Sequence, residues 1–199
     1  SWPDGWTPRE FCPGPTGGPV VSVSPSEAIS DDPSAAEALA RFLDAADRAG
    51  LTVEVRRFAQ GTHTAADAAA AIGCDVAAIV KSVVLVARRG VQEWPVLVLT
   101  SGAHRAELGA VAAAVGCDSV RQARPDEVLG ATGYRVGAVA PLGHPQAIPT
   151  WIDTTLLGRE IVYAAAGTAD SITAMDPAEL AAASAASAID FGASGGARG

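Results

Sequence analysis

The chain has 199 residues and a mass of 20.0 kDa, which suits one domain with a sizeable hydrophobic core. Hydrophobic residues make up 49% of the chain and charged residues 18%, and this composition excludes an intrinsically disordered protein. The net charge of −8 argues against broad, charge-driven binding of nucleic acid. An RNA substrate would therefore have to be held locally or be presented by a partner.

Membrane and metal-binding classes are also disfavoured. No apolar stretch reaches the roughly 18–20 residues that cross a bilayer, and the first residues lack the basic and apolar parts of a signal peptide. We therefore expect a cytoplasmic protein that does not contact a membrane. The cysteines form no CxxC pair and the histidines have no ligand spacing, so a metal is not expected.

The expected elements begin after an irregular leader. Residues 1–33 are rich in Pro, Gly and Ser and lack periodicity, which predicts an extended or disordered arm. A helix should begin at Ser34, where Ser34 and Glu37 form a capping box, and should end at Gly50. A strand is expected over 52–56, and an Ala-rich helix that ends near Gly73 should follow it. A hairpin is expected next, with strands over 79–87 and 94–100 and a turn at 88–90.

The second half of the chain mixes short helices with short strands. Helices are expected before Gly116, over 125–129 and after the cap at Asp176, and strands are expected near Val120 and over 134–139, 148–153, 160–165 and 172–175. Residues 192–199 should form a flexible tail. Because helices and strands do not alternate regularly, we expect an α+β fold, a mainly antiparallel mixed sheet or small barrel flanked by helices.

Lys81 is the only lysine among the 14 basic residues of the chain. Strand alternation places it on one face with Ile79, Val83 and Leu85. An ammonium group there is either desolvated, with a depressed pKa, or held against a phosphate, carboxylate or carbonyl. The alternative is a lysine that extends its charged end from the strand into solvent.

Two later segments are rich in small residues. In the stretch 132–144, Gly137 and Gly143 bracket a proline, and such a loop can direct N–H groups at a carbonyl oxygen or a ribose. In the stretch 163–171, small residues follow a strand and can keep the floor of a pocket open. Each segment could instead be an ordinary turn or a site of tight packing. No Ser/His/Asp or Cys/His nucleophile set and no phosphate loop is evident.

These features, in this order, resemble the YbaK / prolyl-tRNA editing domain family of aminoacyl-tRNA deacylases. The resemblance covers residues 34–191, leaves the leader and tail outside, and is strongest over 79–84, 132–143 and 148–153. It implies a mixed β-barrel with helices outside and hydrolysis, without a cofactor, of the ester that joins an amino acid to tRNA. The expected substrate is tRNA(Pro) carrying Cys or another small amino acid. The expected partners are the 3′ end of that tRNA and a prolyl-tRNA synthetase, and DNA is not expected.

The resemblance also implies roles for individual residues. Lys81 matches the family's essential lysine, and Gly137 belongs to a Gly-x-x-x-Pro loop whose backbone contacts the scissile region. Further residues expected to contact the substrate are Thr62, His63, Ser82, His104, Arg105, Pro141, His144, Gly167, Asp170 and Ser171. The chain departs from many relatives at 165–167, where it has Ala-Ala-Gly and no serine, and at Ala103, where they often have an aspartate. These departures concern the choice of amino acid more than the reaction.

Two other functions remain open at this point. A binding module of the same fold would hold aminoacyl-tRNA or a synthetase without hydrolysis, and the missing serine and the negative charge favour it somewhat. A Schiff-base enzyme would use Lys81 against small carbonyl compounds, although no accompanying acid–base pair is evident.

Overall fold

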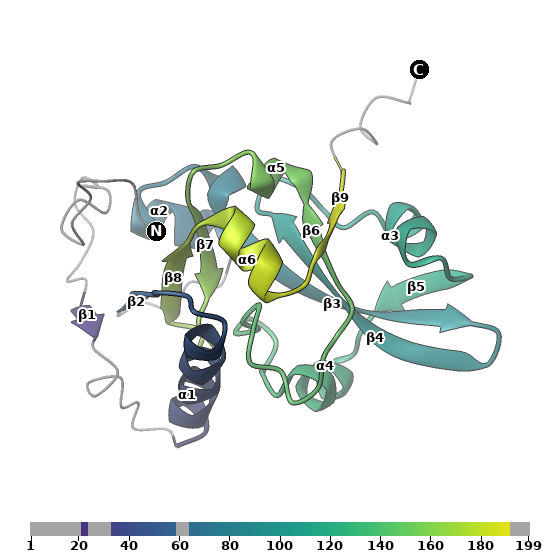
Figure 1. Cartoon of the computed structure of the whole chain (residues 1–199), viewed down its shortest axis with the longest axis horizontal. Helices are drawn as coiled ribbons and strands as arrows, with labels where there is room; N and C mark the ends of the chain where they lie inside the picture. Colours follow the sequence, from purple (N-terminus) through teal and green to yellow (C-terminus); the bar gives the residue numbers. More distant parts are fainter. Residues whose placement is uncertain (1–20, 24–32, 59–63, 192–199) are drawn as a thin grey trace.

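The structure is a computed structural model that describes residues 21–23, 33–58 and 64–191. The described strands form two sheets (Figure 1). The first sheet has the order β1 (Val21–Val23), β2 (Val55–Arg57), β8 (Ser171–Met175), β7 (Val162–Ala165). The second has the order β5 (Ser119–Gln122), β3 (Val80–Arg89), β4 (Gln92–Ser101), β6 (Thr150–Asp153), β9 (Ser187–Ile189).

Short helices surround the sheets. They are α1 (Pro33–Arg48), α2 (Ala65–Ile72), α3 (Leu108–Val115), α4 (Pro125–Thr132), α5 (Thr154–Leu157) and α6 (Pro177–Ala183), with a 3₁₀ turn, η2, at Val76–Ala78. None of the helices in the described ranges has both the length and the apolar character needed to cross a membrane. Figure 1 shows the β3–β4 hairpin projecting from the body that the remaining elements form.

Most strand pairs are antiparallel, and the parallel ones follow long connections. β6 lies parallel to both β4 and β9. An isolated parallel bridge between Ile79 and Tyr163 connects the start of β3 to β7, so the two sheets meet there. The expected α+β class, with a mainly antiparallel mixed sheet flanked by helices, is confirmed.

β3 contributes to the core on both of its faces. Val80 and Val84 pack in a cluster with residues of α1, β4, β6 and α6. Leu85 and Ala87 point the other way and pack with residues of α3 and β9. A strand that is covered on both sides reads as a nearly continuous apolar run, and this explains the run of apolar residues that the sequence has here.

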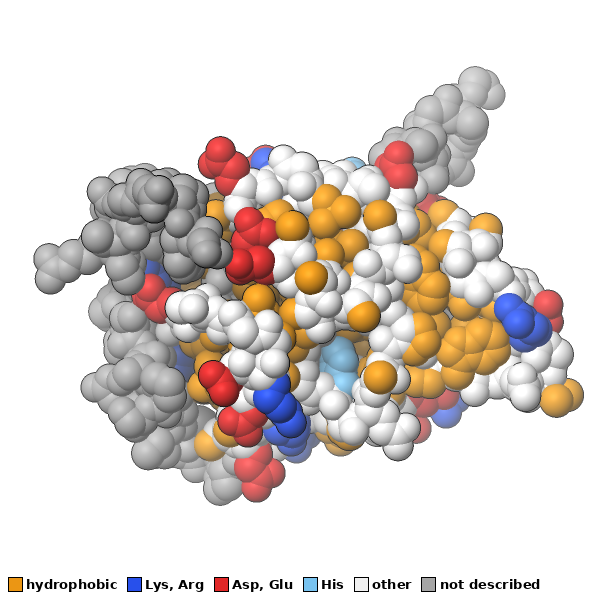
Figure 2. Space-filling model, viewed as in Figure 1, with side chains coloured by type: hydrophobic (Ala, Val, Ile, Leu, Met, Phe, Trp, Pro, Cys, Tyr) orange, Lys and Arg blue, Asp and Glu red, His pale blue; other side chains and the backbone are white. Residues whose placement is uncertain are grey.

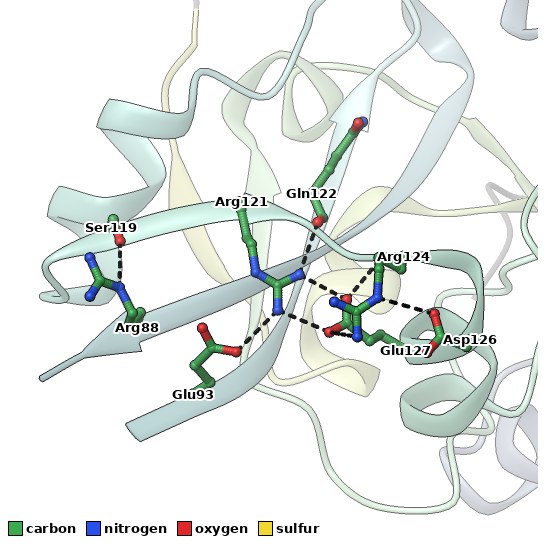
Figure 3. A network of polar contacts seen from close by, with 8 residues as sticks. All are labelled: Arg88, Glu93, Ser119, Arg121, Gln122, Arg124, Asp126 and Glu127. Carbon is green, nitrogen blue, oxygen red and sulfur yellow. Dashed lines mark hydrogen bonds and ion pairs between the residues drawn. The ribbon is translucent and has the colours of Figure 1, made fainter. Parts of the chain in front are cut away.

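An ion-pair network ties α4 to the second sheet (Figure 3). The Arg121 guanidinium on β5 donates to both carboxylate oxygens of Glu127, at 2.8 and 2.9 Å, and to Glu93 on β4 at 3.0 Å. The hydrogen bond from Arg121 is the main cause that lowers the pKa of Glu127 to about 2. Because these groups lie at the surface, the network orients α4 more than it stabilises the fold.

The sequence predictions were wrong for residues 134–139, which form no strand. Gly133 and Gly137 adopt φ values of +72° and +86°, a left-handed conformation that interrupts extended structure. The segment instead wraps around the buried Tyr134 side chain, whose hydroxyl donates to the Leu142 carbonyl at 2.8 Å. The Arg41 guanidinium lies over the Tyr134 ring, with its carbon atom 5.2 Å from the ring centre.

Smaller corrections concern boundaries. β3 continues to Arg89, so the expected turn at 88–90 is displaced to Gly90 and Val91, and the expected strand over 52–56 is observed as Val55–Arg57. α4 extends beyond the expected 125–129 to Thr132. β1 lies within the expected arm and pairs with β2, and α5 and β9 were not anticipated.

We predict that Tyr134→Phe destabilises the protein by about 1–3 kcal/mol, because the Leu142 carbonyl is left buried without its donor. Urea unfolding measures this loss. Burial raises the pKa of Tyr134 to about 12, so the native state keeps a proton that the unfolded state releases near its usual value of 10. Stability should therefore fall as pH rises from about 10 to 12. An unchanged late phenolate step at 295 nm in the variant would contradict this assignment.

Candidate functional site

A cavity of about 380 Å³ lies where the two sheets meet. Its walls come from α2, the start of β3, the loop around Gly137, and the facing ends of β7 and β8. The residues at its centre are Lys81, Ser82, Gly137, Ala164, Ala165 and Ser171. The three segments that the sequence analysis singled out therefore border one space.

Lys81 is held in place by backbone carbonyl groups. Its ammonium nitrogen donates to the carbonyl oxygen of His104 and lies 3.4 Å from that of Gly102. Both carbonyls belong to the turn that follows β4. An ammonium group has three donors, so one has no partner among the described residues and could bind a group in the cavity.

Lys81 is half-buried. Burial lowers the pKa of Lys81, and the nearby Arg105 charge lowers it further, while Asp153 opposes both effects. The alternative of a lysine that simply extends into solvent does not agree with its hydrogen bonds to two carbonyl groups.

The turn after β4 is tightly packed. The Gly102 amide donates to the Ile79 carbonyl at 2.7 Å, and a Cβ atom on Gly102 would lie 2.2 Å from the Val76 carbonyl oxygen. The Ser101 hydroxyl donates to the Ala77 carbonyl at 2.9 Å and accepts from the Ala103 amide at 3.3 Å. The turn is thus joined to η2 on one side and to Lys81 on the other.

A cluster of hydroxyl groups also borders the cavity. The Thr168 hydroxyl lies 2.5 Å from the Ser171 hydroxyl and 2.6 Å from an Asp170 carboxylate oxygen. Arg57 of β2 donates to Asp170 at 2.6 and 3.1 Å. Burial raises the pKa of Asp170, but the hydrogen bonds from Thr168 and Arg57 outweigh it and hold that pKa below its usual value. Thr168 and Ser171 border the cavity, whereas Asp170 supports them from behind.

Ser82 is the polar group of the cavity that lacks a partner. Its hydroxyl oxygen is buried and makes no hydrogen bond with any described residue, although Ser82 borders the cavity. A buried hydroxyl without a partner costs free energy, and a ligand in the cavity could supply the missing partner.

The two glycines of the predicted site differ in their surroundings. Gly137 has a φ of +86°, and a Cβ atom on it would meet nothing within 4 Å. Gly167 has a φ of +97°, and a Cβ atom on it would lie 2.8 Å from the Ala38 carbonyl oxygen of α1. Gly137 therefore leaves open space beside the cavity, and Gly167 allows α1 to approach closely.

Other predicted residues lie elsewhere. Pro141 and His144 border a second cavity, of about 530 Å³, rather than the one beside Lys81. His144 packs edge-on against Tyr134 and contacts the Ala140 carbonyl at 3.0 Å, and burial lowers its pKa. Thr62 and His63 lie outside the described residues. His104 and Arg105 lie on the turn that holds Lys81.

The sequence analysis missed Asp153, the most deeply buried carboxyl group of this region. Its side chain has an exposure of 0% and lies 2.8 Å from His104 Nδ1. Its signal in the sequence was a single aspartate directly after the apolar strand 150–152. Arg57 was also missed, because the pairing of β2 with β8 brings it to Asp170. Thr168 was missed as well, although its contacts with Asp170 and Ser171 are local.

Two sheets thus meet at a cavity that the anchored Lys81 ammonium borders, and comparison with known proteins identifies the family of this fold. The model of the aminoacyl-tRNA editing domain matches residues 59–183, and the chain belongs to that family. It is 28% identical over 127 residues to the uncharacterized protein YwhH of Bacillus subtilis (strain 168). The aligned region covers 64% of this chain and 78% of that protein.

Solved structures agree with this assignment. A crystal structure described as a candidate trans-editing enzyme for prolyl tRNA synthetase is 37% identical, with a TM-score of 0.71 over 81% of this chain and 98% of its own. The hypothetical protein APE2540 is 30% identical, with a TM-score of 0.69 over 75% of this chain and 97% of its own. The resemblance to the YbaK-like editing family is thereby confirmed.

We predict that Gly102→Ala destabilises the protein by about 1–3 kcal/mol, because the new methyl group overlaps the Val76 carbonyl and forces the turn away from η2. Gly109→Ala is the matched control, since a Cβ atom there meets nothing and the residue lies in α3. That control should gain about 0.5–1 kcal/mol. Equal stabilities of the two variants in thermal unfolding would show that the turn is not tightly packed.

Proposed function

We propose that the protein hydrolyses the ester bond of mischarged tRNA in the cavity beside Lys81, and that residues 34–191 form the catalytic domain. The observation that carries the proposal is the anchored, partly desolvated Lys81 ammonium at the edge of a cavity whose other lining side chains are uncharged. Membership of the aminoacyl-tRNA editing family supplies the chemical class of the substrate.

The chemistry needs an electrophilic carbonyl, a stabiliser for its developing negative charge, and a water molecule. The free donor of Lys81 can bind the carbonyl oxygen or the adjacent terminal phosphate, and it does so at little reorganisation cost because the ammonium group is already held. Gly137 leaves the loop backbone open to the terminal ribose. Ser82 can then orient the amino acid through its unpartnered hydroxyl.

The cavity suits a small amino acid. Its walls carry small side chains, among them Ala65, Ala68, Ala164 and Ala165, and its volume of about 380 Å³ must also admit the terminal ribose. We propose that the substrate is tRNA(Pro) carrying Cys or another small amino acid. The 37% identity to a candidate trans-editing enzyme for prolyl tRNA synthetase supports this choice and a synthetase as partner.

A panel of charged tRNAs tests the proposal. Release of amino acid from Cys-, Ala-, Ser- and Pro-tRNA(Pro) is measured with and without the protein. We expect one or two of the small amino acids to be released from the tRNA, and no release of Pro. Tight binding of these tRNAs without any hydrolysis would favour the binding module instead, and borohydride trapping of a carbonyl compound on Lys81 would favour the Schiff-base enzyme.

We predict that Lys81→Arg lowers the hydrolysis rate at least about 10²-fold, the scale for loss of one preorganised electrostatic contact. The planar guanidinium cannot direct donors at both carbonyls and into the cavity as the compact ammonium does. Lys81→Ala should be similarly inactive and no less stable, because a partly buried charge is removed. Near-normal turnover of a folded Lys81→Arg variant would remove Lys81 from the chemistry.

Arginines near the cavity offer a local grip on the tRNA. Most arginines in the described ranges contact a carboxylate, carbonyl or hydroxyl, as Arg57 does with Asp170. The side chains of Arg105 and Arg135 are exposed and have no such partner among the described residues. Arg105 follows the turn that holds Lys81, and Arg135 precedes Gly137 in its loop. We propose that both contact phosphates of the tRNA 3′ strand.

We predict that Arg105→Ala and Arg135→Ala each raise KM several-fold and reduce the slope of log KM against log salt by about 1, the change expected for loss of one phosphate contact. Arg88→Ala is the control, because Arg88 contacts Ser119 and lies at the opposite end of β3 from Lys81. An unchanged salt dependence in both test variants would place the tRNA elsewhere.

A further inference from the structure

We propose that Asp153 is the positioning residue of the site: its carboxyl group holds the turn after β4 in the conformation that anchors Lys81. No residue role considered so far includes Asp153. The effect on hydrolysis rests on the proposed deacylase function, but the effect on Lys81 itself does not.

Both oxygen atoms of Asp153 are occupied. Oδ1 accepts from the Thr155 amide at 2.9 Å and so caps α5. Oδ2 accepts from the Ser101 amide at 3.1 Å and lies 2.8 Å from His104 Nδ1. The same carboxyl group therefore contacts the first residue of the turn through its backbone and the fourth through its side chain.

The turn transmits this constraint to Lys81. The amide of His104 also donates to the Ser101 carbonyl at 3.0 Å, which closes the turn between the two residues that Asp153 holds. Closing it directs the carbonyl groups of Gly102 and His104 at the Lys81 ammonium. Asp153 thus acts on Lys81 through Ser101 and His104, and it determines where the carbonyl oxygens that accept from Lys81 lie.

The burial of the Asp153 carboxyl group is energetically unfavourable, and this favours a functional role for it over a purely structural one. A carboxyl group with 0% exposure loses its hydration, and an apolar side chain in the same place would avoid that penalty. The charged groups that act on Lys81 are Arg105 and Asp153, with opposite effects on its pKa. Asp153 consequently favours the charged form of an ammonium group that burial and Arg105 both disfavour.

The experiment uses the fact that Lys81 is the only lysine of the chain. Protein labelled with ¹³C-lysine gives one side-chain signal, and its Cε shift followed against pH reports the Lys81 pKa without tRNA. In parallel, kcat and KM are measured on the best substrate of the tRNA panel. If no tRNA is hydrolysed by the wild type, the proposed function fails while the titration still tests the positioning role.

Asp153→Asn keeps the size of the side chain and removes its charge. We expect the Lys81 pKa to fall by about half a unit or more, as for loss of a nearby opposite charge. We expect kcat to fall about tenfold with KM within about twofold, because the loss acts on the transition state. Asp176→Asn is the matched control: Asp176 caps α6 through the amides of Ala178 and Glu179. It should change neither the pKa nor kcat.

A second pair of variants covers the case in which Asp153→Asn does not fold. His104→Asn retains a side-chain donor close to the position of Nδ1, whereas His104→Leu removes the donor and keeps the backbone carbonyl that binds Lys81. We expect the Lys81 titration of the Asn variant to match that of the wild type, and the Leu variant to show an altered Lys81 titration and a lower kcat. Wild-type titration and kcat in a folded Asp153→Asn or in His104→Leu would overturn the proposal.

Discussion

The site depends on one interaction, the contact of the Lys81 ammonium with the two carbonyl groups of the turn after β4. A partly desolvated cation is costly unless hydrogen bonds replace its lost water. The surrounding structure meets that need at several levels. Gly102 lets the turn approach η2, Ser101 ties it to Ala77, and Asp153 closes it from the side of β6. These groups hold a cation that forms no ion pair with a carboxylate in the part of the chain that the structure describes.

The cavity exists because two sheets meet without merging. The bridge from Ile79 to Tyr163 brings the start of β3 against β7, and beyond it the strands diverge. Large side chains would fill the resulting space, but apart from Tyr163 the residues of β7 and of the segment after it that border the space are alanines and a threonine. The hydroxyls of Thr168 and Ser171 satisfy each other, and Arg57 neutralises Asp170 behind them. The segment 168–171 therefore contributes to the shape of the cavity and not to its charge, which comes from Lys81.

The sequence predicted those parts of the fold that depend on local patterns. Period-two and helical periodicity located β3, β4, α1 and α2, and glycines marked the ends of α2 and α3. It failed at 134–139, where apolar residues resemble a strand but glycines with positive φ and a buried Tyr134 produce a loop. Lys81 was recognised because an isolated charge in an apolar strand is a local anomaly. Asp153 was not, because its partners lie about fifty residues away in the sequence and are brought to it by the parallel pairing of β6 with β4.

The same distinction between local and distant contacts explains how a chain of net charge −8 can act on tRNA. Arginines that are paired within the protein, such as Arg121 with Glu93 and Glu127, or Arg159 with Asp75, contribute little attraction for a polyanion. Figure 2 shows acidic side chains at several places on one face of the molecule. An acidic surface repels the body of a nucleic acid, and screening confines that repulsion to about 8–10 Å at physiological salt. Attraction then comes from the cations that have no partner among the described residues, such as Arg105 and Arg135, and from Lys81, which borders the cavity. Under the proposed function, such a distribution favours a single terminal strand over a duplex, because only a terminus can reach the cavity without bringing more phosphates against the acidic surface.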